Sequence, residues 1–234
     1  SPLDFETATE WGLAAQKAAA EAVGADKSFL HWTGADDILT ETYSPTDVAA
    51  YRDFLPLLQE IGYVERSERL GVFTRRAAYG RHFDRMAETR YVRDFLPSVG
   101  AHDALTLYVP AEQRPVPEPA VQLVVHSSTP GRAFGARHTE VARRLRPAFV
   151  AGVAVQRQMA RVRGDLMSLV DASGGTCVVF SLSGRLVHVS QALEHVLVRE
   201  PRREALLDGV RKVAAKALSS LSKAGSASFS GGAE

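Results

Sequence analysis

The chain of 234 residues has a single cysteine, Cys177. An internal disulfide bond is therefore excluded, and such cysteine usage fits a reducing compartment. No apolar run approaches the roughly 18 residues that a membrane-spanning helix needs, and no signal peptide is visible. The 28 basic and 27 acidic residues give a net charge of +1, which is not the charge signature of a nucleic-acid-binding protein. These absences predict a cytoplasmic protein that does not enter a membrane.

Motifs of common catalytic sites are also missing. The chain has no G-x-S-x-G, no phosphate-binding G-x-x-x-x-G-K and no G-x-G-x-x-G after a predicted strand. The seven histidines lack the spacing of a zinc site, and one cysteine limits thiolate ligation. His82 near Asp84, and His102 beside Asp103, could act as an acid/base pair only if the fold supplied a third group. We therefore expect no enzyme, no catalytic residue and no metal site, and the sequence names no cofactor.

Hydrophobic periodicity predicts a mixed α+β chain with an ordinary hydrophobic content of 45%. A helix starting at Ser1 should end at Gly24, and a second should run from Ser44 to about Gly62. Residues 63–79 give a mixed pattern of a short strand or an irregular lid, and residues 81–96 return to helical spacing. Strands are expected at residues 27–32, 38–43, 104–109 and 121–126, the last two as an antiparallel pair joined by a proline-rich connection.

One long helix, residues 138–163, organises the rest of the chain. Thr139 is a plausible N-cap, and Val141, Leu145, Phe149 and Val153 follow one another at intervals of four. Pro147 lies inside this pattern and should kink the helix. Seven arginines between residues 137 and 163 form either a solvated face or a site for an acidic partner surface. The apolar stripe must pack on a sheet, on a partner chain or on both.

The remaining segment predicts a small second module. Gly164 marks a hinge, and residues 177–180 and 186–189 should form a hairpin with its turn at Ser183-Gly184. A last helix is expected at residues 204–218, and the Ser-, Gly- and Ala-rich residues 219–234 should be disordered. Cys177 is interpreted as a buried, inert thiol, although His188 on the facing strand could lower its pKa and make it redox-active.

Two motifs resemble parts of bacterial LuxR-type transcription regulators. The segments Arg132-Ala-Phe134 and His138-Thr-Glu-Val-Ala-Arg-Arg-Leu-Arg-Pro-Ala-Phe149 resemble the end of their GAF-like sensor domain, where an Arg and a Phe precede a helix with a Leu-Arg-Pro step. The hairpin resembles the opening of a PAS domain, but Ser190 stands where PAS sequences commonly have Asn, and too few residues follow for a complete domain. The resemblance implies a GAF-like antiparallel sheet flanked by helices in residues 1–163, with a PAS-like partial module in residues 164–218.

The resemblance also implies a sensory function. Aromatic residues are concentrated in the first half of the chain, and in a GAF-like domain the sheet and its covering helices enclose a cavity suited to a small organic effector. The expected lining consists of Trp32, Tyr51, Phe54, Phe73, Tyr91 and Phe95, with His82 as a polar group. The alternative is that these rings simply fill the core.

We expect a homodimer with Leu145, Phe149 and Val153 in its interface, and DNA binding only through a helix-turn-helix domain outside this chain. The competing hypothesis is a ligand-free dimerisation or partner-docking scaffold. One further pattern is a repeat: Arg52-Asp-Phe-Leu-Pro56 recurs as Arg93-Asp-Phe-Leu-Pro97. We interpret it as chance or as two similar helix ends rather than a duplicated unit.

Overall fold

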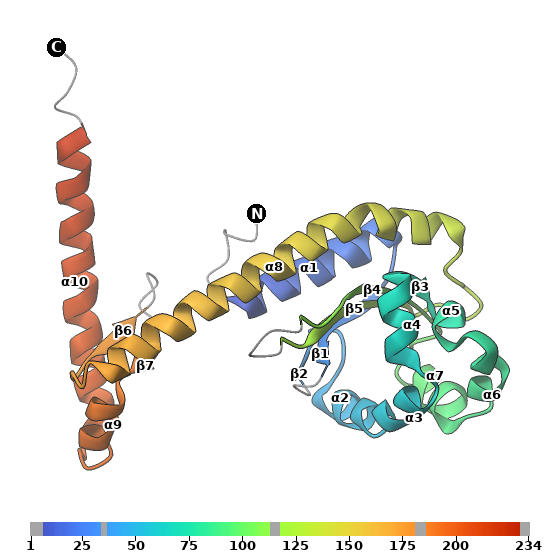
Figure 1. The fold of residues 1–234 in the computed structure, drawn as a ribbon, viewed down its shortest axis with the longest axis horizontal. Coiled ribbons are helices and arrows are strands. Elements are labelled where there is room, and N and C mark those ends of the chain that lie inside the picture. Colours follow the sequence, from blue (N-terminus) through green and yellow to red (C-terminus); the bar gives the residue numbers. More distant parts are fainter. Residues whose placement is uncertain (1–6, 34–36, 113–117, 181–185, 230–234) are drawn as a thin grey trace. The chain divides into compact units, whose positions relative to one another are not determined.

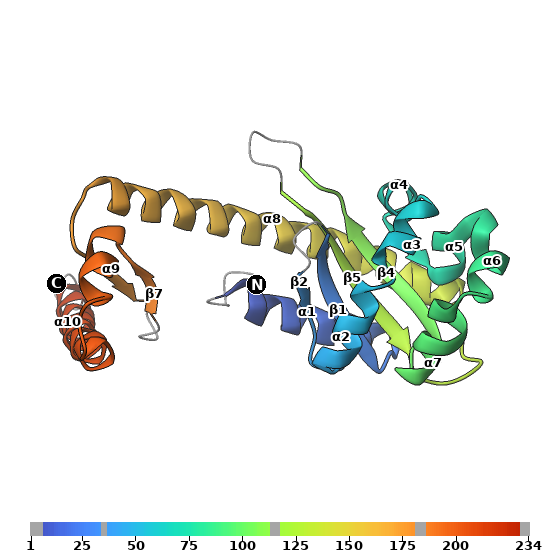
Figure 2. The ribbon, with the colours of Figure 1, turned by 90° about the horizontal axis from the view of Figure 1, so that it is seen from below.

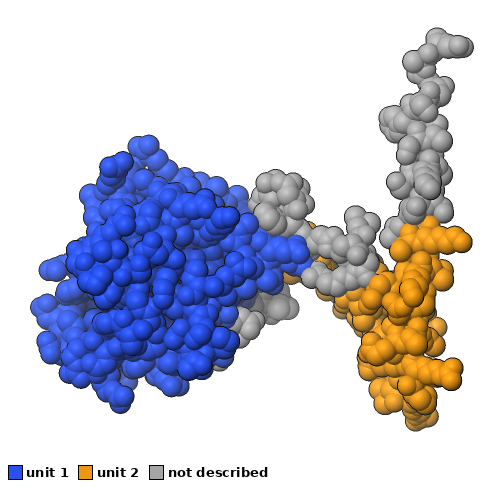
Figure 3. All heavy atoms as spheres, turned by 180° about the vertical axis from the view of Figure 1, so that it is seen from behind, with its two compact units in different colours: residues 1–157 blue, residues 158–234 orange. Residues whose placement is uncertain are grey.

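The computed structural model describes residues 7–33, 37–112, 118–180 and 186–229. The chain divides into two compact units, unit 1 (residues 1–157) and unit 2 (residues 158–234), coloured separately in Figure 3. The division falls inside helix α8 (Ala136–Ala172), and the boundary predicted at residue 163 stays a prediction. No helix in the described part of the chain is long and apolar enough to span a membrane.

Unit 1 is built on a five-stranded antiparallel sheet with the strand order β2-β1-β5-β4-β3. Its strands are β1 (Lys27–Thr33), β2 (Asp37–Leu39), β3 (Val72–Thr74), β4 (Asp103–Val109) and β5 (Ala120–Ser127). The predicted antiparallel pairing of the last two strands is confirmed, with Leu107 opposite Leu123 and Tyr108 opposite Gln122. Because side chains alternate along each strand, every strand contributes to both faces of the sheet.

One face of the sheet is covered by α1 (Ala8–Val23) and by the part of α8 in unit 1, as Figures 1 and 2 show. We call this the aliphatic face because Leu and Val side chains of β1, β4 and β5 form most of it. Trp11 of α1 stacks on Phe149 of α8, with ring centroids 5.9 Å apart. A Cβ atom at Gly152 would lie 2.4 Å from the Trp11 ring, so this glycine permits the close approach of the two helices.

The opposite face is covered by a series of short helices (Figure 1). They are α2 (Pro45–Arg52), α3 (Leu55–Glu60), α4 (Tyr63–Leu70), α5 (Arg75–Tyr79), the 3-10 turn η2 (Gly80–His82), α6 (Phe83–Ala87), the single-turn π-helix η3 (Tyr91–Phe95) and α7 (Leu96–Ser98). The sequence predicts longer helices here. Gly62 and Gly71, both with φ near 65°, separate α3 from α4 and α4 from β3, and the mixed pattern of residues 63–79 resolves into helix, strand and helix.

Of the predicted helix starts, the one at Ser44 is confirmed and the N-cap at Thr139 is wrong. Helix α2 begins after Ser44, as predicted, and Ser44 and Asp47 form a reciprocal capping box with distances of 3.2 and 3.0 Å. Helix α1 begins after Thr7, which forms a capping box with Glu10, whereas the predicted start at Ser1 lies outside the described residues. The predicted N-cap Thr139 is wrong: α8 begins at Ala136, and the Thr139 hydroxyl donates to the Gly135 carbonyl within the first turn.

In unit 2 the predicted hairpin is confirmed, with β6 (Val178–Phe180) paired antiparallel to β7 (Leu186–Val189); its turn lies outside the described residues. Helices α9 (Gln191–Leu197) and α10 (Arg203–Phe229) follow. Helix α10 continues to Phe229 through a segment predicted to be disordered. Gly164 does not interrupt α8, so the predicted hinge is not seen there. Cys177 is half-buried just before β6, and His188 contacts Asp171 at 3.2 Å.

Candidate functional site

The face of the sheet beneath α2 to α7 carries aromatic and polar side chains, and we call it the aromatic face. Strand alternation directs Phe29 and His31 of β1 toward this face, while Leu30 and Trp32 belong to the aliphatic face. Thr106 of β4 and His126 of β5 line the same side as Phe29. The two faces therefore have different chemistry although the same strands build both.

The repeated sequence supplies the rings that meet above the sheet. In the first copy Tyr51 precedes Phe54, and in the second Tyr91 precedes Phe95. The ring centroids of Phe54 lie 4.9 Å from Tyr91 and 5.2 Å from Phe95, and those of Tyr51 and Tyr91 are 6.3 Å apart. The second copy has one extra residue, Val92, between its tyrosine and the shared five residues. The π-helix η3 accommodates that extra residue, so the two copies form one aromatic cluster.

Two adjoining cavities lie between these rings and the sheet. Each is small: about 30 Å³ is open to the centre of a water molecule, within about 360 Å³ of space that is not filled by protein atoms and is partly open to solvent. They share Phe29, Tyr51, Tyr91 and His126 as common walls. The Tyr43 cavity is further lined by Ile38, Tyr43, Asp47, Val48, Phe95, Leu96, Val99 and Ala101. The Arg75 cavity is further lined by Leu58, Tyr63, Arg75, Ala78, Tyr79, Ala104, Thr106 and Val124.

Burial keeps the tyrosines and His126 of the aromatic face neutral. All six tyrosines of the chain pack in this cluster, and burial raises the pKa of each. The pKa of Tyr63 rises to about 12. Burial, with the positive charges of Arg75 and Lys27, lowers the pKa of His126 to about 3. The Tyr43 hydroxyl lies 2.7 Å from Nδ1 of this neutral imidazole. The site therefore offers neutral donors and acceptors among apolar rings.

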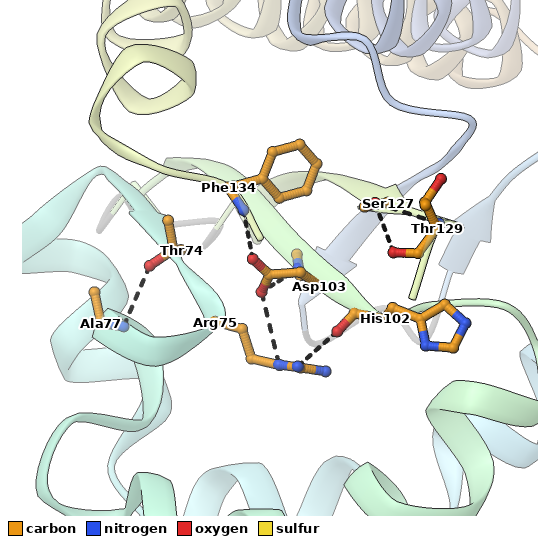
Figure 4. Close-up of polar contacts among 9 residues, drawn as sticks. Thr74, Arg75, Ala77, His102, Asp103, Ser127, Thr129 and Phe134 are labelled. Carbon is orange, nitrogen blue, oxygen red and sulfur yellow. Dashed lines mark hydrogen bonds and ion pairs between the residues drawn. The ribbon is translucent and has the colours of Figure 1, made fainter. Parts of the chain in front are cut away.

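Arg75 contributes the positive charge of its cavity and connects it to the segment before α8 (Figure 4). Its Nη2 donates to the His102 carbonyl at 2.6 Å, and its Nε lies 3.8 Å from Oδ1 of Asp103. The other Asp103 oxygen, Oδ2, accepts from the backbone N of Phe134 at 2.7 Å. A contiguous set of contacts thus links the cavity wall to the chain just ahead of α8.

The structure brings together most, but not all, of the residues predicted to line a pocket. Tyr51, Tyr91 and Phe95 line a cavity, and Phe54 and Phe73 belong to the same aromatic cluster. Trp32 packs on the opposite face of the sheet, against the aliphatic core. His82 lies near the surface beside Arg81. Ligand binding by the predicted residues stays a prediction, and Trp32 and His82 are not placed to take part in it.

Sequence reasoning missed several residues of the site: Phe29, Tyr43, Tyr63, Arg75, Tyr79 and His126. Alternation in the predicted strands carries the signal for two of them, because Phe29 lies opposite Val124 and His126 is two residues farther along β5 on the same face. The same alternation places Trp32 on the other face, with Leu30. No local pattern identifies Arg75, whose position depends on the long-range pairing of β3 with β4.

The predicted dimer interface needs correction. Phe149 and Val153 are 6% and 3% exposed and pack into the aliphatic core of their own unit. Their side chains are therefore not available to a second chain without opening that core. Leu145 is half-buried and lines a hollow between α1 and α8 together with Ala14 and Ala148. Homodimerisation itself stays a prediction.

Comparison with solved structures gives a distant likeness. No family model matches the chain, and no curated protein matches it. Among solved structures, the VqsR LBD domain from Pseudomonas aeruginosa is 20% identical over 58% of this chain and 79% of that chain, with a TM-score of 0.44. Within the described residues, no group of three or more His, Cys, Asp or Glu side chains is placed to hold a metal ion.

Proposed function

We propose that this chain is the sensory region of a bacterial transcription regulator and binds a small organic effector on its aromatic face. The observation that carries the proposal is the pair of adjoining cavities lined by aromatic rings, a few neutral polar groups and the charged side chains Arg75 and Asp47. Ligand sites have this composition, because apolar walls supply affinity and isolated polar groups orient the ligand. The motif resemblance to LuxR-type regulators adds the regulatory role. DNA would be read by a helix-turn-helix domain outside this chain.

The effector would act by favouring one of two arrangements of the domain, since a ligand shifts an equilibrium only through unequal affinity for its states. The contacts that support such a change run from Arg75 to Asp103 and then to the backbone N of Phe134. Phe134 lies just before the start of α8 at Ala136. A ligand that moves Arg75 would therefore alter the support of the segment that leads into this helix.

A thermal-unfolding screen with small aromatic and aliphatic compounds tests effector binding. A compound that binds only the folded state at 100 times its Kd stabilises it by about 2.7 kcal/mol and raises the midpoint. The Tyr51→Leu variant removes a wall shared by both cavities and should reduce this shift. The matched variant Trp32→Leu alters the opposite face and should retain it. Absence of any shift, or an equal shift in the Tyr51→Leu variant, would contradict the proposal.

A specific feature of α8 favours homodimerisation as a second function. Apolar or small residues recur along the helix at alternating intervals of four and three: Val141, Leu145, Ala148, Gly152, Val155, Met159, Val162, Leu166 and Leu169. This 3.5-residue period is typical of the seam of a two-stranded coiled coil. Gly152 contacts Trp11 of its own chain, but the part of the seam in unit 2 is open: Val162, Leu166 and Leu169 are 55%, 51% and 69% exposed.

The partner that fits this seam is a second copy in parallel orientation. Parallel pairing places Gln158 near Arg163 of the other copy, and Asp165 near Val170, so no like charges meet. Antiparallel pairing about the same segment would bring two copies of Arg163 together and two copies of Asp165 together. The flanking charges therefore favour the parallel arrangement.

Light scattering of the purified chain tests the seam. Leu166→Glu should convert a dimer to a monomer because it places a charge in the apolar seam, whereas the matched variant Ser168→Glu, outside the seam, should remain dimeric. In a Cys177→Ser background, Leu166→Cys should form an interchain disulfide bond if the helices are parallel. A monomeric wild-type chain, or a dimer that is insensitive to Leu166→Glu, would contradict the proposal that two copies of α8 pair through this seam.

A further inference from the structure

The Arg75 cavity has an unbalanced electrostatic composition. Its described lining contains one guanidinium, four tyrosines, one threonine and one histidine, and no carboxylate. The nearest acidic partner, Asp103, is not part of the lining, and its Oδ1 lies 3.8 Å from Nε of Arg75. That distance is too long for a hydrogen bond, although the charges still attract one another. The positive charge is thus only loosely compensated.

Arg75 also retains unused capacity to bind an acceptor. A guanidinium has five N–H donors in a planar arrangement that fits a carboxylate. Among the described residues, Arg75 donates one hydrogen bond, from Nη2 to the His102 carbonyl. Asp103 is itself occupied, because its oxygens accept from the backbone N of Ala104 at 2.9 Å and of Phe134 at 2.7 Å. Competition for Arg75 would therefore not leave the Asp103 carboxylate without partners.

The surroundings of Arg75 suit an anion but add no second charge. Burial first, and then the positive charge of Arg75, keeps the pKa of His126 at about 3, so this imidazole is neutral. Burial raises the pKa of Tyr79 and Tyr91, which remain protonated donors. Phe29 and Tyr51, on the shared wall, supply apolar ring surface between the two cavities. The lining of the Arg75 cavity thus combines one positive charge, hydroxyl donors and apolar ring surface.

We propose that the effector is a small carboxylic acid whose carboxylate pairs with Arg75 and whose apolar body lies against Phe29, Tyr51 and Tyr91. This inference rests on the proposed function and specifies the chemical class of its ligand. The ligand carboxylate replaces Asp103 as the partner of the Arg75 guanidinium. Asp103 also accepts a hydrogen bond from the backbone N of Phe134, just before α8. Ligand binding is thereby connected to the start of that helix through a single shared cation.

Two pairs of compounds with matched shape and different charge test the inference. Phenylacetate is compared with phenylacetamide, and hexanoate with hexanamide, by thermal unfolding and by calorimetric titration of the whole chain. Each acid should bind at least tenfold more tightly than its amide, because only the acid carries the charge that pairs with Arg75. Arg75→Gln should abolish this preference, and Arg75→Lys should retain part of it, since the ammonium keeps the charge but loses the planar donor pair.

The matched control is Arg76→Gln. Arg76 is adjacent in sequence, but its guanidinium packs over the Phe83 ring at 4.8 Å and does not line the cavity, so this variant should keep the acid preference. Circular dichroism of each variant establishes that it is folded. Equal binding of acid and amide, or an acid preference that survives Arg75→Gln, overturns the inference. Binding of neutral compounds alone also overturns it but leaves effector binding intact, whereas failure of every compound tested refutes both proposals.

Discussion

The two faces of the unit 1 sheet are built by the same strands but differ in nearly every chemical respect. The aliphatic face is formed by Leu30, Leu105, Leu107, Leu123 and Val125 against α1 and α8, and both tryptophans pack with it. The aromatic face holds all six tyrosines, together with His126 and two cavities. The aliphatic face combines deeply buried Leu and Val side chains with a hollow between α1 and α8, whereas the aromatic face combines rings with hydroxyl groups and two smaller cavities.

This difference separates stability from binding. Close-packed aliphatic side chains gain the full benefit of burial, whereas a buried hydroxyl or imidazole costs free energy unless it finds a partner. The Tyr108 hydroxyl has no hydrogen-bond partner among the described residues. A face with buried hydroxyl groups that lack a partner, next to open cavities, is better suited to binding a ligand than to stabilising the fold.

The largest expected effect is the loss of a ring from the aliphatic face. Phe149→Ala should lower the free energy of unfolding by about 3–5 kcal/mol, because it leaves a cavity beneath Trp11. The matched variant Phe54→Ala, on the partly open aromatic face, should cost well below that. Urea unfolding followed by tryptophan fluorescence measures both variants. Equal costs would mean that the two faces are packed alike.

Acid should lower the free energy of unfolding through His126 of the aromatic face. The pKa of His126 is about 3 in the folded chain, compared with its ordinary 6.5 when unfolded. The unfolded state therefore binds the extra proton first, so the stability present above pH 6.5 declines as pH falls toward 3, by up to about 1.4 kcal/mol per pH unit. Urea midpoints at pH 7, 6, 5 and 4 should fall less steeply for His126→Gln. Parallel declines in the two proteins would exclude His126 as the cause.

Two glycines of α8 should respond to alanine with opposite signs. Gly152→Ala places a Cβ atom 2.4 Å from the Trp11 ring and should destabilise by about 1–3 kcal/mol through overpacking. Among the described residues, no atom lies within 4 Å of the place that a Cβ atom at Gly164 would occupy, so Gly164→Ala should stabilise the helix by about 0.5–1 kcal/mol. Thermal unfolding of the two variants distinguishes them. A penalty at Gly164 would show a contact on that side of α8.

The smallest effect concerns single hydroxyl groups of the aromatic face. Tyr108→Phe removes a buried hydroxyl without a described partner and should leave stability unchanged or slightly raised. Tyr63→Phe removes the hydroxyl that donates to Gln122 at 3.1 Å and should cost about 1 kcal/mol. Denaturant unfolding at pH 7 compares the pair. A clear loss of stability in Tyr108→Phe would mean that its hydroxyl has a partner.

Alternation of apolar residues made much of the sheet predictable from the sequence. The surfaces against which the helices pack could not be predicted in this way. The pairing of β4 with β5 follows from alternating apolar residues and is found as expected. The stripe through Phe149 and Val153 correctly indicated burial, but a helical period cannot tell a sheet of the same chain from a second chain. These two residues face their own core, and the exposed stripe at Val162, Leu166 and Leu169 lies on another side of the helix.

The candidate site was predictable only in part, for a related reason. Aromatic enrichment identified Tyr51, Tyr91 and Phe95, because rings cluster wherever the fold brings them. The prediction that Trp32 lines the pocket does not fit the structure, because it was made from the residue type and not from the position of Trp32 in the alternation of β1. The repeat is interpreted from the sequence as chance or as two similar helix ends, and in the structure the ring centroids of its two phenylalanines, Phe54 and Phe95, lie 5.2 Å apart. Contacts between segments this distant in sequence depend on the turns between them, which local patterns do not specify.

The segregation of indole and phenol rings has a practical consequence for anyone searching for a ligand. Excitation at wavelengths absorbed by tryptophan reports from Trp11 and Trp32, both of which lie across the sheet from the cavities. Emission quenching, the usual first assay, would then register little when a compound enters. Tyrosine absorbance and near-ultraviolet circular dichroism report on the face of the sheet that carries the cavities. They should therefore be recorded before a compound is dismissed as inactive.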